Sequence, residues 1–262
     1  MVKRVWVIGI GPGGIDQVTV AAIRALNRVE VFLVPDKGAA KHDLVALREQ
    51  ICATYIDHDY RIIEVPDPER GPDAERSADQ YAGGVRDWHR ARADRYAELL
   101  TGLPEADAGF LVWGDPAFYD STLRILDTLQ ADGLEFEVTV VPGISAIQLL
   151  AGEHRTVLNR IGQPIHITTG RRLVADYRAY GSDLGDLVVM LDGALTCREL
   201  RAEPLEIFWG AYLGAPEQVL RRGRLDAVID EIVDLRARLR AAHGWIMDTY
   251  LLRPITPAGP TP

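Results

Sequence analysis

The sequence predicts an α/β fold built from two α/β domains, and three observations support it. Short apolar runs alternate with helical patterns along the first 150 or so residues, as in a largely parallel sheet. Loops rich in glycine or proline follow three of the expected strands, at residues 9–14, 113–116 and 142–145. After Gly152 the pattern changes to strands separated by arginine-rich helices. We therefore expect ligands at the carboxyl edge of the first sheet.

The first unit of the chain is a strand, a glycine loop and a helix. Four apolar residues, 5–8, precede Gly9-Ile10-Gly11-Pro12-Gly13-Gly14, and helix-compatible residues run from Thr19 to Leu26. The loop is a poor match to a dinucleotide-binding loop. Pro12 and Gly13 stand inside the motif, and Pro12 lacks the N–H group that a pyrophosphate would use. Asp36 follows Pro35 and is expected in a loop, so it does not end the second strand as a ribose-binding acid would.

The remaining elements follow from apolar periodicity. In the first domain we expect strands at 29–34, 61–65, 108–112 and 136–141, and helices at 42–56, 88–100 and 121–129. Residues 66–84 are polar and are expected to form a mobile insertion, whose acidic run at 67–75 is solvated.

The second domain is expected to hold strands at 164–169, 187–191, 205–213 and 244–252, and a helix at 224–242. Residues 155–162 are the expected hinge. We therefore predict an N-terminal domain at 1–154, a C-terminal domain at 155–252, and a disordered tail at 253–262 that contains four prolines.

Composition excludes several classes of protein. The chain has 262 residues, is 47% hydrophobic and carries a net charge of −9, which disfavours nucleic acid as a partner. No apolar run reaches the ~20 residues of a membrane span, so we expect no membrane association and a cytoplasmic location. Only Cys52 and Cys197 are cysteines, as in a reducing compartment. Three of the 29 basic residues are lysine, so a polycarboxylate ligand would meet mainly guanidinium groups.

The three loops carry the residues best suited to a site. Asp115 could accept hydrogen bonds from a ligand, although taken alone it is better explained as a cap of the next helix, and Ser145 allows the same alternative. Taken together, three such loops in one sheet favour a site. Tyr119 opens a helix beside Asp115. The six histidines lack metal-ligand spacing, so no metal site is expected. Neither a Gly-x-Ser-x-Gly elbow nor a phosphate-binding P-loop is present, and Cys52 is expected to be buried.

At these loops the chain resembles a known family, the S-adenosylmethionine-dependent tetrapyrrole (corrin/porphyrin) methyltransferases. The matching motifs, in order, are Gly9-Ile10-Gly11-Pro12-Gly13, Gly114-Asp115-Pro116-Ala117-Phe118-Tyr119, Val141-Pro142-Gly143-Ile144-Ser145-Ala146 and the strand that ends at Met190. Further motifs are similar to one subgroup that also removes an acyl group: residues 34–38, 43–45, 67–70, 112–116 and 209–214.

The resemblance implies a class III methyltransferase fold, usually a homodimer, with S-adenosylmethionine in a cleft between two α/β domains and S-adenosylhomocysteine as a product. By residue-wise match the cofactor contacts would be Pro12, Trp113, Gly114, Asp115, Ser145, Ala146, Met190, Ala211 and Leu213. The glycine loop would face the tetrapyrrole substrate. Two positions depart from the family pattern: Gly14 stands where many relatives have an acid, the nearest being Asp16, and Trp113 stands where many have glycine.

The implied reaction is methyl transfer to a ring carbon of a corrin precursor with loss of an acetyl group as acetate. Methyl transfer needs little acid–base help, because alignment of the reactants alone can supply ~7–11 kcal/mol. Deacylation needs a group that orients or activates water. Asp16, Asp36, Asp115 and Tyr119 are the candidates, and all four remain open. Arg171 and Arg172 either bind the substrate's carboxylates or are ordinary surface charges.

Other functions stay possible on sequence alone. A sister methylase acting at another ring position is the strongest alternative, and an RNA methylase of the same fold is less favoured by the acidic composition. A nicotinamide-dependent oxidoreductase and a tetrapyrrole-binding protein without catalysis are the alternatives outside the methylases.

Overall fold

The structure is a computed structural model that describes residues 4–36, 42–66, 78–103 and 106–255. It does not describe the side chains of Asp36 and of residues 42–45 and 78–87. The chain forms two compact units, which we describe separately. Unit 1 comprises residues 1–11 and 15–144, and unit 2 comprises residues 12–14 and 145–262. The domain boundary expected before residue 155 stays a prediction.

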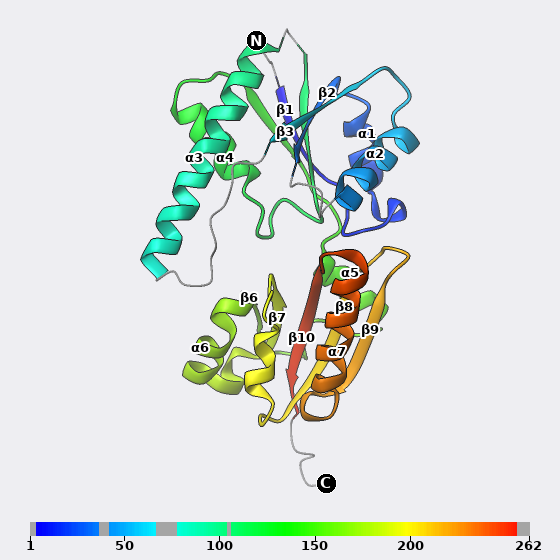
Figure 1. Cartoon of the computed structure of the whole chain (residues 1–262), viewed down its shortest axis with the longest axis vertical. Helices are drawn as coiled ribbons and strands as arrows, with labels where there is room; N and C mark the ends of the chain where they lie inside the picture. The colour runs from blue at the N-terminus through cyan, green and yellow to red at the C-terminus, as the bar shows by residue number, and fades with distance from the viewer. Residues whose placement is uncertain (1–3, 37–41, 67–77, 104–105, 256–262) are drawn as a thin grey trace. The chain divides into compact units, whose positions relative to one another are not determined.

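Unit 1 is built on a parallel sheet of five strands in the order β3-β2-β4-β1-β5 (Figure 1). The strands are β1 (Arg4–Gly9), β2 (Val31–Asp36), β3 (Arg61–Pro66), β4 (Ala108–Val112) and β5 (Glu137–Val141). In register, Val7 of β1 lies opposite Phe110 of β4 and Val140 of β5. β4 is buried along its whole length, as expected for an inner strand covered on both faces.

Helices cover both faces of this sheet. α1 (Val20–Leu26) and α2 (His42–Tyr55) lie on one side, and α3 (Ala78–Gly102) and α4 (Thr122–Ala131) lie on the other (Figure 1). Successive strand residues therefore enter different hydrophobic clusters: Val7 packs with the α3 and α4 residues, and Ile8 packs with those of α1 and α2. The Thr19 hydroxyl starts α1 by accepting a hydrogen bond from Ala22 N at 3.0 Å.

Unit 2 contains a mixed sheet of five strands in the order β6-β7-β10-β8-β9. The strands are β6 (Ile165–Thr169), β7 (Asp186–Met190), β8 (Leu205–Ala211), β9 (Val219–Arg224) and β10 (Asp248–Pro254). β10 runs antiparallel to both of its neighbours, β7 and β8. The ends of β7 and β8 and the start of β10 consequently lie at one edge of the sheet.

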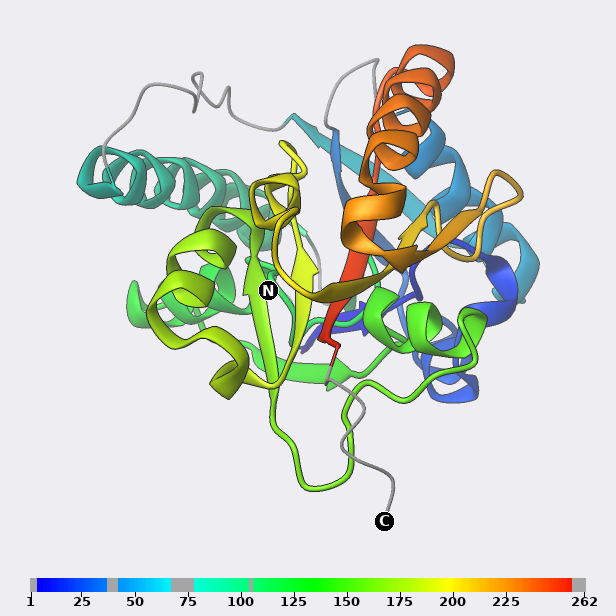
Figure 2. The same ribbon diagram turned by 90° about the horizontal axis from the view of Figure 1, so that it is seen from below.

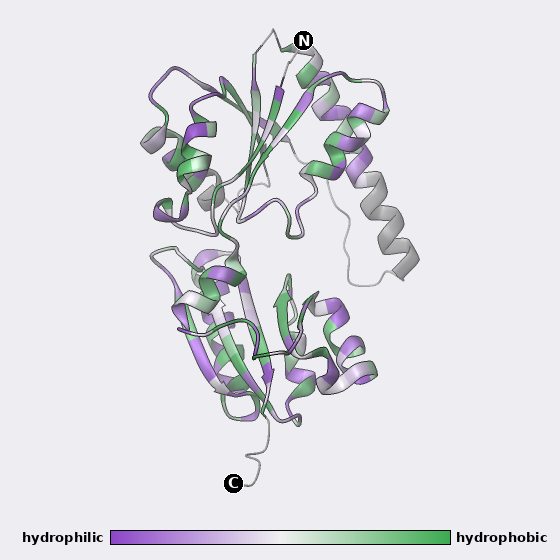
Figure 3. Ribbon diagram, turned by 180° about the vertical axis from the view of Figure 1, so that it is seen from behind, coloured by the Kyte–Doolittle hydropathy of each residue, from purple (hydrophilic) through white to green (hydrophobic). Residues whose placement is uncertain are grey.

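The helices of unit 2 also lie on both faces of its sheet. They are α5 (Ala146–Glu153), α6 (Gly170–Tyr180) and α7 (Leu225–His243), with short 3-10 turns η3 (Gly181–Leu184) and η4 (Thr196–Leu200). α7 and α5 lie on opposite sides of β8 and β10 (Figure 2). Hydrophobic residues are concentrated in the strands of both sheets, apart from the arginine-rich edge strand β9 (Figure 3).

Several expected element boundaries were wrong. Pro35 and Asp36 belong to β2 rather than to a loop. β2 pairs with β4 only at Val31 and Phe32, so Pro35 is not required to donate on that side. α3 begins at Ala78, so residues 78–84 of the expected insertion are helical, while residues 67–77 lie outside the described chain.

In unit 2 the sequence missed β9 and placed other ends imprecisely. The expected strand at 244–252 starts only at Asp248, and it continues through Pro254, which pairs with Leu205. Arg253 and Pro254 therefore lie in the sheet rather than in the expected tail, of which residues 256–262 lie outside the described chain.

Candidate active site

Three strand-to-helix loops of unit 1 meet at the carboxyl edge of its sheet. They follow β1 and its two neighbours, β4 and β5. Gly11 and Gly114 form a two-way backbone bridge, with Gly114 N donating to Gly11 O at 2.8 Å and Gly11 N donating to Gly114 O at 3.3 Å. The third loop joins them through Gly143 N, which donates to Asp115 Oδ2 at 2.8 Å.

Glycine is required where these backbones approach each other. A Cβ atom on Gly143 would lie 2.1 Å from Gly114 O, and one on Gly9 would lie 2.5 Å from Gly143 N. Both distances are shorter than any real Cβ contact, and both involve backbone atoms that no side-chain rotation can move away. The glycines therefore fix the three loops against one another, rather than forming a phosphate cradle.

Both carboxylate oxygens of Asp115 accept backbone hydrogen bonds. Oδ1 accepts from Ala117 N at 2.8 Å, and Oδ2 accepts from Gly143 N at 2.8 Å. The first bond closes a tight turn within the loop, and the second links two loops. The capping alternative was wrong, because α4 begins at Thr122 with Ser121 as its N-cap. Asp115 is therefore a structural acceptor in this arrangement.

The other three acid–base candidates do not share one environment. Asp16 is exposed on the short helix η1 (Ile15–Gln17), and the side chain of Asp36 at the end of β2 lies outside what the structure describes. Tyr119 lies in the same loop as Asp115, has a left-handed backbone (φ 54°) and is 42% exposed. Burial of part of its ring raises the pKa of the Tyr119 phenol, which favours the protonated donor.

Two buried arginines beside this loop were missed by sequence reasoning. Arg48 of α2 is 7% exposed, donates to Leu111 O at 3.3 Å and lies over the Trp113 ring at 5.9 Å. Arg92 of α3 is 8% exposed, stacks on Trp88 at 3.9 Å and lies 3.4 Å from Ser121 Oγ. Burial lowers the pKa of Arg48, and the charge of Asp120 opposes this effect. Nothing in the periodicity of α2 and α3 marks these two arginines among so many.

In unit 2 the expected cofactor residues lie at the edge where β7 and β8 end. Met190 is the last residue of β7, and Ala211 the last of β8. The residues that follow, Leu191 and Tyr212, have left-handed backbones with φ of 53° and 49°. Both strands thus turn sharply at this edge, at a conformational cost that the surrounding contacts must offset.

The loop residues grouped with unit 2 pack close to this edge. A Cβ on Gly13 would lie 2.4 Å from Leu213 O, so only glycine fits there beside Pro12. Ser145 caps α5 in a reciprocal capping box with Gln148, whose side-chain oxygen accepts from Ser145 N at 2.9 Å and from Ser145 Oγ at 3.0 Å. The Ser145 hydroxyl is thus used within the protein, and Ala146 is the first residue of α5.

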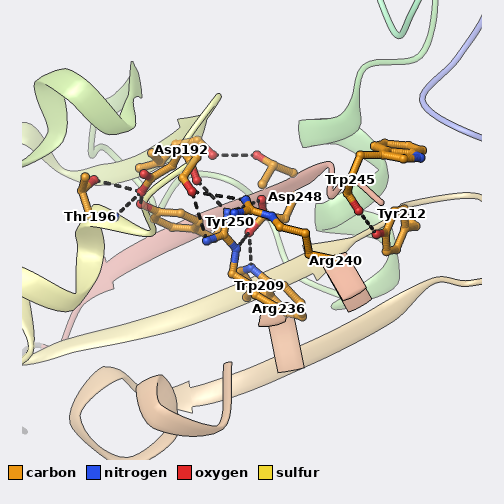
Figure 4. Close-up of polar contacts among 12 residues, drawn as sticks. Asp192, Thr196, Trp209, Tyr212, Arg236, Arg240, Trp245, Asp248 and Tyr250 are labelled. Atoms are coloured by element: carbon orange, nitrogen blue, oxygen red, sulfur yellow. Dashed lines mark hydrogen bonds and ion pairs between the residues drawn. The ribbon is translucent and has the colours of Figure 1, made fainter. Parts of the chain in front are cut away.

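A buried polar network lies beneath the same edge (Figure 4). Arg236 of α7 donates to both oxygens of Asp248, at 2.8 and 3.1 Å, and to Asp192 O at 2.9 Å. Trp209 Nε1 donates to Asp248 Oδ2 at 2.8 Å. Tyr250 OH donates to Asp192 Oδ2 at 2.5 Å, and Thr196 N donates to the same oxygen at 2.6 Å. We refer to these six residues as the edge network. Scattered between residues 192 and 250, they carry no sequence motif.

The remaining polar candidates have structural partners. Arg172 donates to Asp176 at 2.7 Å, and Asp176 also accepts from Thr168 and lies 3.2 Å from His166 Nε2. Burial raises the pKa of both thiols, Cys52 and Cys197, to about 12, so neither is a thiolate at neutral pH. Among the described residues there is no group of three or more His, Cys, Asp or Glu side chains suited to a metal ion. Within the same ranges no helix has the length and apolar character to cross a bilayer.

Comparison with known proteins identifies the fold. A model of the tetrapyrrole (corrin/porphyrin) methylases matches residues 4–229. The chain belongs to this family. The match covers all three loops and continues through unit 2 to the start of α7.

Two relatives cover nearly the whole methylase. The chain is 43% identical over 255 residues to a Sinorhizobium precorrin-6A synthase (deacetylating), covering 96% of this chain and 95% of the relative. It is 39% identical to a solved structure from Corynebacterium diphtheriae described as a cobalamin synthesis related protein (CobF), with a TM-score of 0.81 and coverage of 97% and 100%.

A more distant solved structure shares the fold alone. It is the uroporphyrin-III C-methyltransferase of Thermus thermophilus in complex with S-adenosylhomocysteine, at 18% identity, with a TM-score of 0.55 and coverage of 95% and 92%.

Proposed function

We propose that this methylase transfers a methyl group from S-adenosylmethionine to C-1 of precorrin-5 and releases the acetyl group as acetate, which gives precorrin-6A. The observation that carries the proposal is the 43% identity to a precorrin-6A synthase across 96% of the chain. This chemistry requires no catalytic triad, because S-adenosylmethionine supplies a methyl group already activated on a sulfonium and the protein mainly aligns the reactants.

We propose that residues at the edges of the two sheets contact the cofactor. We assign its contacts to Trp113, Gly114 and Asp115 of unit 1 and to Pro12, Ser145, Ala146, Met190, Ala211 and Leu213 of unit 2. At the unit 2 edge, Tyr212 has a left-handed backbone, and Gly13 has no side chain between it and Leu213 O. Backbone groups are therefore exposed to a ligand at this edge.

Trp245 offers an unused hydrogen-bond donor beside the segment 211–213. Its indole nitrogen Nε1 is buried and has no hydrogen-bond acceptor within the described structure, and its ring packs on Tyr212 at 5.2 Å. A buried N–H group without an acceptor is costly, so a bound ligand that supplies one would be favoured.

For the deacylation step we favour Tyr119 among the four candidates. Both oxygens of Asp115 already accept backbone hydrogen bonds, and Asp16 is exposed on η1. The Tyr119 phenol lies in the loop that carries Asp115, and its raised pKa keeps the proton available. It would hydrogen-bond the acetyl carbonyl oxygen while water attacks the carbonyl carbon. The bond between that carbon and the ring would then break with its electron pair left on the ring, which takes the methyl group from the sulfonium, and both protons of the water would pass to solvent as acetate leaves.

We further propose that the protein is cytoplasmic and, as the family resemblance implies, a homodimer. Within the fold the runner-up is methylation at another ring position of a related tetrapyrrole. The acidic net charge of −9 weighs against an RNA substrate.

The test is turnover of purified precorrin-5 with S-adenosylmethionine. We expect the product mass to show one methyl group gained and one acetyl group lost, with one acetate released per turnover. If the product gained a methyl group and no acetate were released, the protein would still be a methyltransferase, but the proposed deacetylating reaction would be contradicted. As a binding control, S-adenosylhomocysteine at ~100 times its Kd should raise the free energy of unfolding by ~2.7 kcal/mol, whereas NAD should not.

A further inference from the structure

We propose that the edge network is a positioning element that sets the affinity of unit 2 for S-adenosylmethionine. The inference rests on the proposed function, because it assumes that the cofactor contacts Met190 and the segment 211–213. It adds a role for residues of α7, η4 and β10 that are not among those assigned contacts.

The topology of unit 2 places the network between the two cofactor segments. β7 ends at Met190 and β8 ends at Ala211, and β10 lies between these strands with Asp248 paired to Ala211. Asp248 therefore opens the central strand at the edge where both segments leave the sheet. A side chain anchored at Asp248 can reach either segment.

Arg236 uses this position to join the two sides. Its guanidinium is 8% exposed and binds Asp248 through Nε and Nη2, and Nη2 also donates to the backbone oxygen of Asp192, two residues after Met190. On the other side, Asp248 accepts from Trp209, two residues before Ala211. One planar group thus connects the end of β7 to the end of β8.

The Asp192 side chain fixes the turn after Met190. Its Oδ2 atom accepts from Thr196 N and Tyr250 OH, and the Thr196 hydroxyl lies 2.9 Å from it. A Cβ on Gly170 would lie 2.4 Å from the Asp192 carboxylate, so the carboxylate sits directly on the start of α6. With Asp192 held, Leu191 keeps its left-handed backbone and leaves its side chain 65% exposed.

The segment after β8 is held from the same edge. Tyr212 N donates to Met247 O at 2.9 Å, and Met247 directly precedes Asp248. The Tyr212 hydroxyl donates to Trp245 O at 2.5 Å (Figure 4). Buried ionic groups are often no more stabilising than apolar residues of equal volume, and in some proteins their role is instead to select one arrangement. We therefore expect that disturbing the network weakens cofactor binding, and does not only lower the stability of the fold.

The test compares mild variants that keep the core filled. Tyr250→Phe removes the hydroxyl bound to Asp192, and Thr196→Val removes the hydroxyl shared by Asp192 and Gly170 O. We expect the Kd of S-adenosylhomocysteine, measured by titration calorimetry well below the unfolding temperature, to rise about 2- to 30-fold. The KM for S-adenosylmethionine should rise with it, while the KM for the tetrapyrrole stays unchanged.

A matched control lies on the same helix. Glu231→Gln removes an exposed ion pair between α7 and Arg221 of β9, outside the network, and should leave the Kd unchanged. Amide hydrogen exchange in the ligand-free protein gives a second readout: Tyr250→Phe should speed exchange at residues 191–193 and at Tyr212 and Leu213.

The outcomes separate the two proposals. If the wild type binds S-adenosylhomocysteine and both variants bind it equally well, the network has only a structural role and the inference is overturned, even if the unfolding temperature falls. Faster exchange without a change in Kd overturns it as well. If the wild type does not bind S-adenosylhomocysteine, the proposed function fails and the inference fails with it.

Discussion

At the scale of single residues, Asp115 shows how one carboxylate can link two loops through backbone hydrogen bonds. It accepts from Ala117 N within its own loop and from Gly143 N in the neighbouring one. Of the two alternatives that the sequence allowed, the helix cap was wrong, because Ser121 is the N-cap of α4, and the ligand acceptor stays a prediction. Both oxygens of the Asp115 carboxylate already accept hydrogen bonds from the backbone, so we do not favour Asp115 as the base.

We predict that Asp115→Asn lowers methylation and acetate release together. The amide can accept only one of the two hydrogen bonds and points its NH₂ group at the other N–H donor, so the variant should lose about 1–3 kcal/mol of stability. Steady-state assays of both products and urea unfolding would check this.

Asp120→Asn is the matched control, since Asp120 Oδ1 accepts from one backbone group, Thr122 N, at 2.7 Å. It should perturb the linked loops less. If Asp115→Asn instead accumulated a methylated product that kept its acetyl group, Asp115 would be the deacylation base and our assignment would be wrong.

At the scale of elements, the site of unit 1 depends on how closely three parallel strands bring their loops together. Gly9, Gly114 and Gly143 lie at or just after the ends of three adjacent strands. A Cβ atom on Gly9 or Gly143 would overlap the backbone of a neighbouring loop. Loop convergence is thus a property of strand order, with β1 between β4 and β5.

We expect Gly143→Ala to destabilise the protein by about 1–3 kcal/mol and to lower activity strongly, because its Cβ would overlap Gly114 O at 2.1 Å and force the loops apart. Gly152→Ala is the control: it lies within α5 with no atom within 4 Å of the added Cβ, and it should stabilise by about 0.5–1 kcal/mol. Urea unfolding of both variants checks the pair. Equal effects of the two substitutions would contradict the proposed close packing.

The elements that the sequence predicted each carry a local pattern, either a buried apolar run or a helix cap. β1 and β4 are apolar runs buried on both faces, and Ser145 caps α5 as its hydroxyl allowed. β9 was missed because Val219–Arg224 contains three arginines at an exposed edge, where burial imposes no alternation. The start of α3 was missed because its polar composition resembles a loop.

At the scale of the whole molecule, the three loops could be predicted and the edge network could not. The loops are contiguous motifs at strand ends, so topology alone brings them together. Asp192, Arg236 and Asp248 are far apart in sequence, and the pairing of β10 between β7 and β8 is what makes them neighbours. Long-range antiparallel pairing is not encoded by any local pattern.

The last prediction concerns how the stability of the whole chain responds to acid. His154 ends α5, donates from Nε2 to Trp209 O at 3.0 Å and packs on Phe208 at 5.6 Å. Burial lowers the pKa of His154 below 6.5, and the Arg222 charge adds to this, while the Trp209 carbonyl, Glu153 and Glu206 oppose it. The unfolded chain therefore binds this proton more readily than the folded one.

The free energy of unfolding should consequently be unaffected by His154 above about pH 7 and should fall as the pH drops from about 6.5 through the folded pKa. The slope from one such proton cannot exceed about 1.4 kcal/mol per pH unit. His154→Gln keeps a donor for Trp209 O and does not titrate, so its urea unfolding at pH about 7.5, 6.5 and 5.5 should show a weaker decline than the wild type. Identical declines in the two proteins would mean that other groups carry the acid sensitivity, since removing the titrating imidazole must remove its share of the linkage.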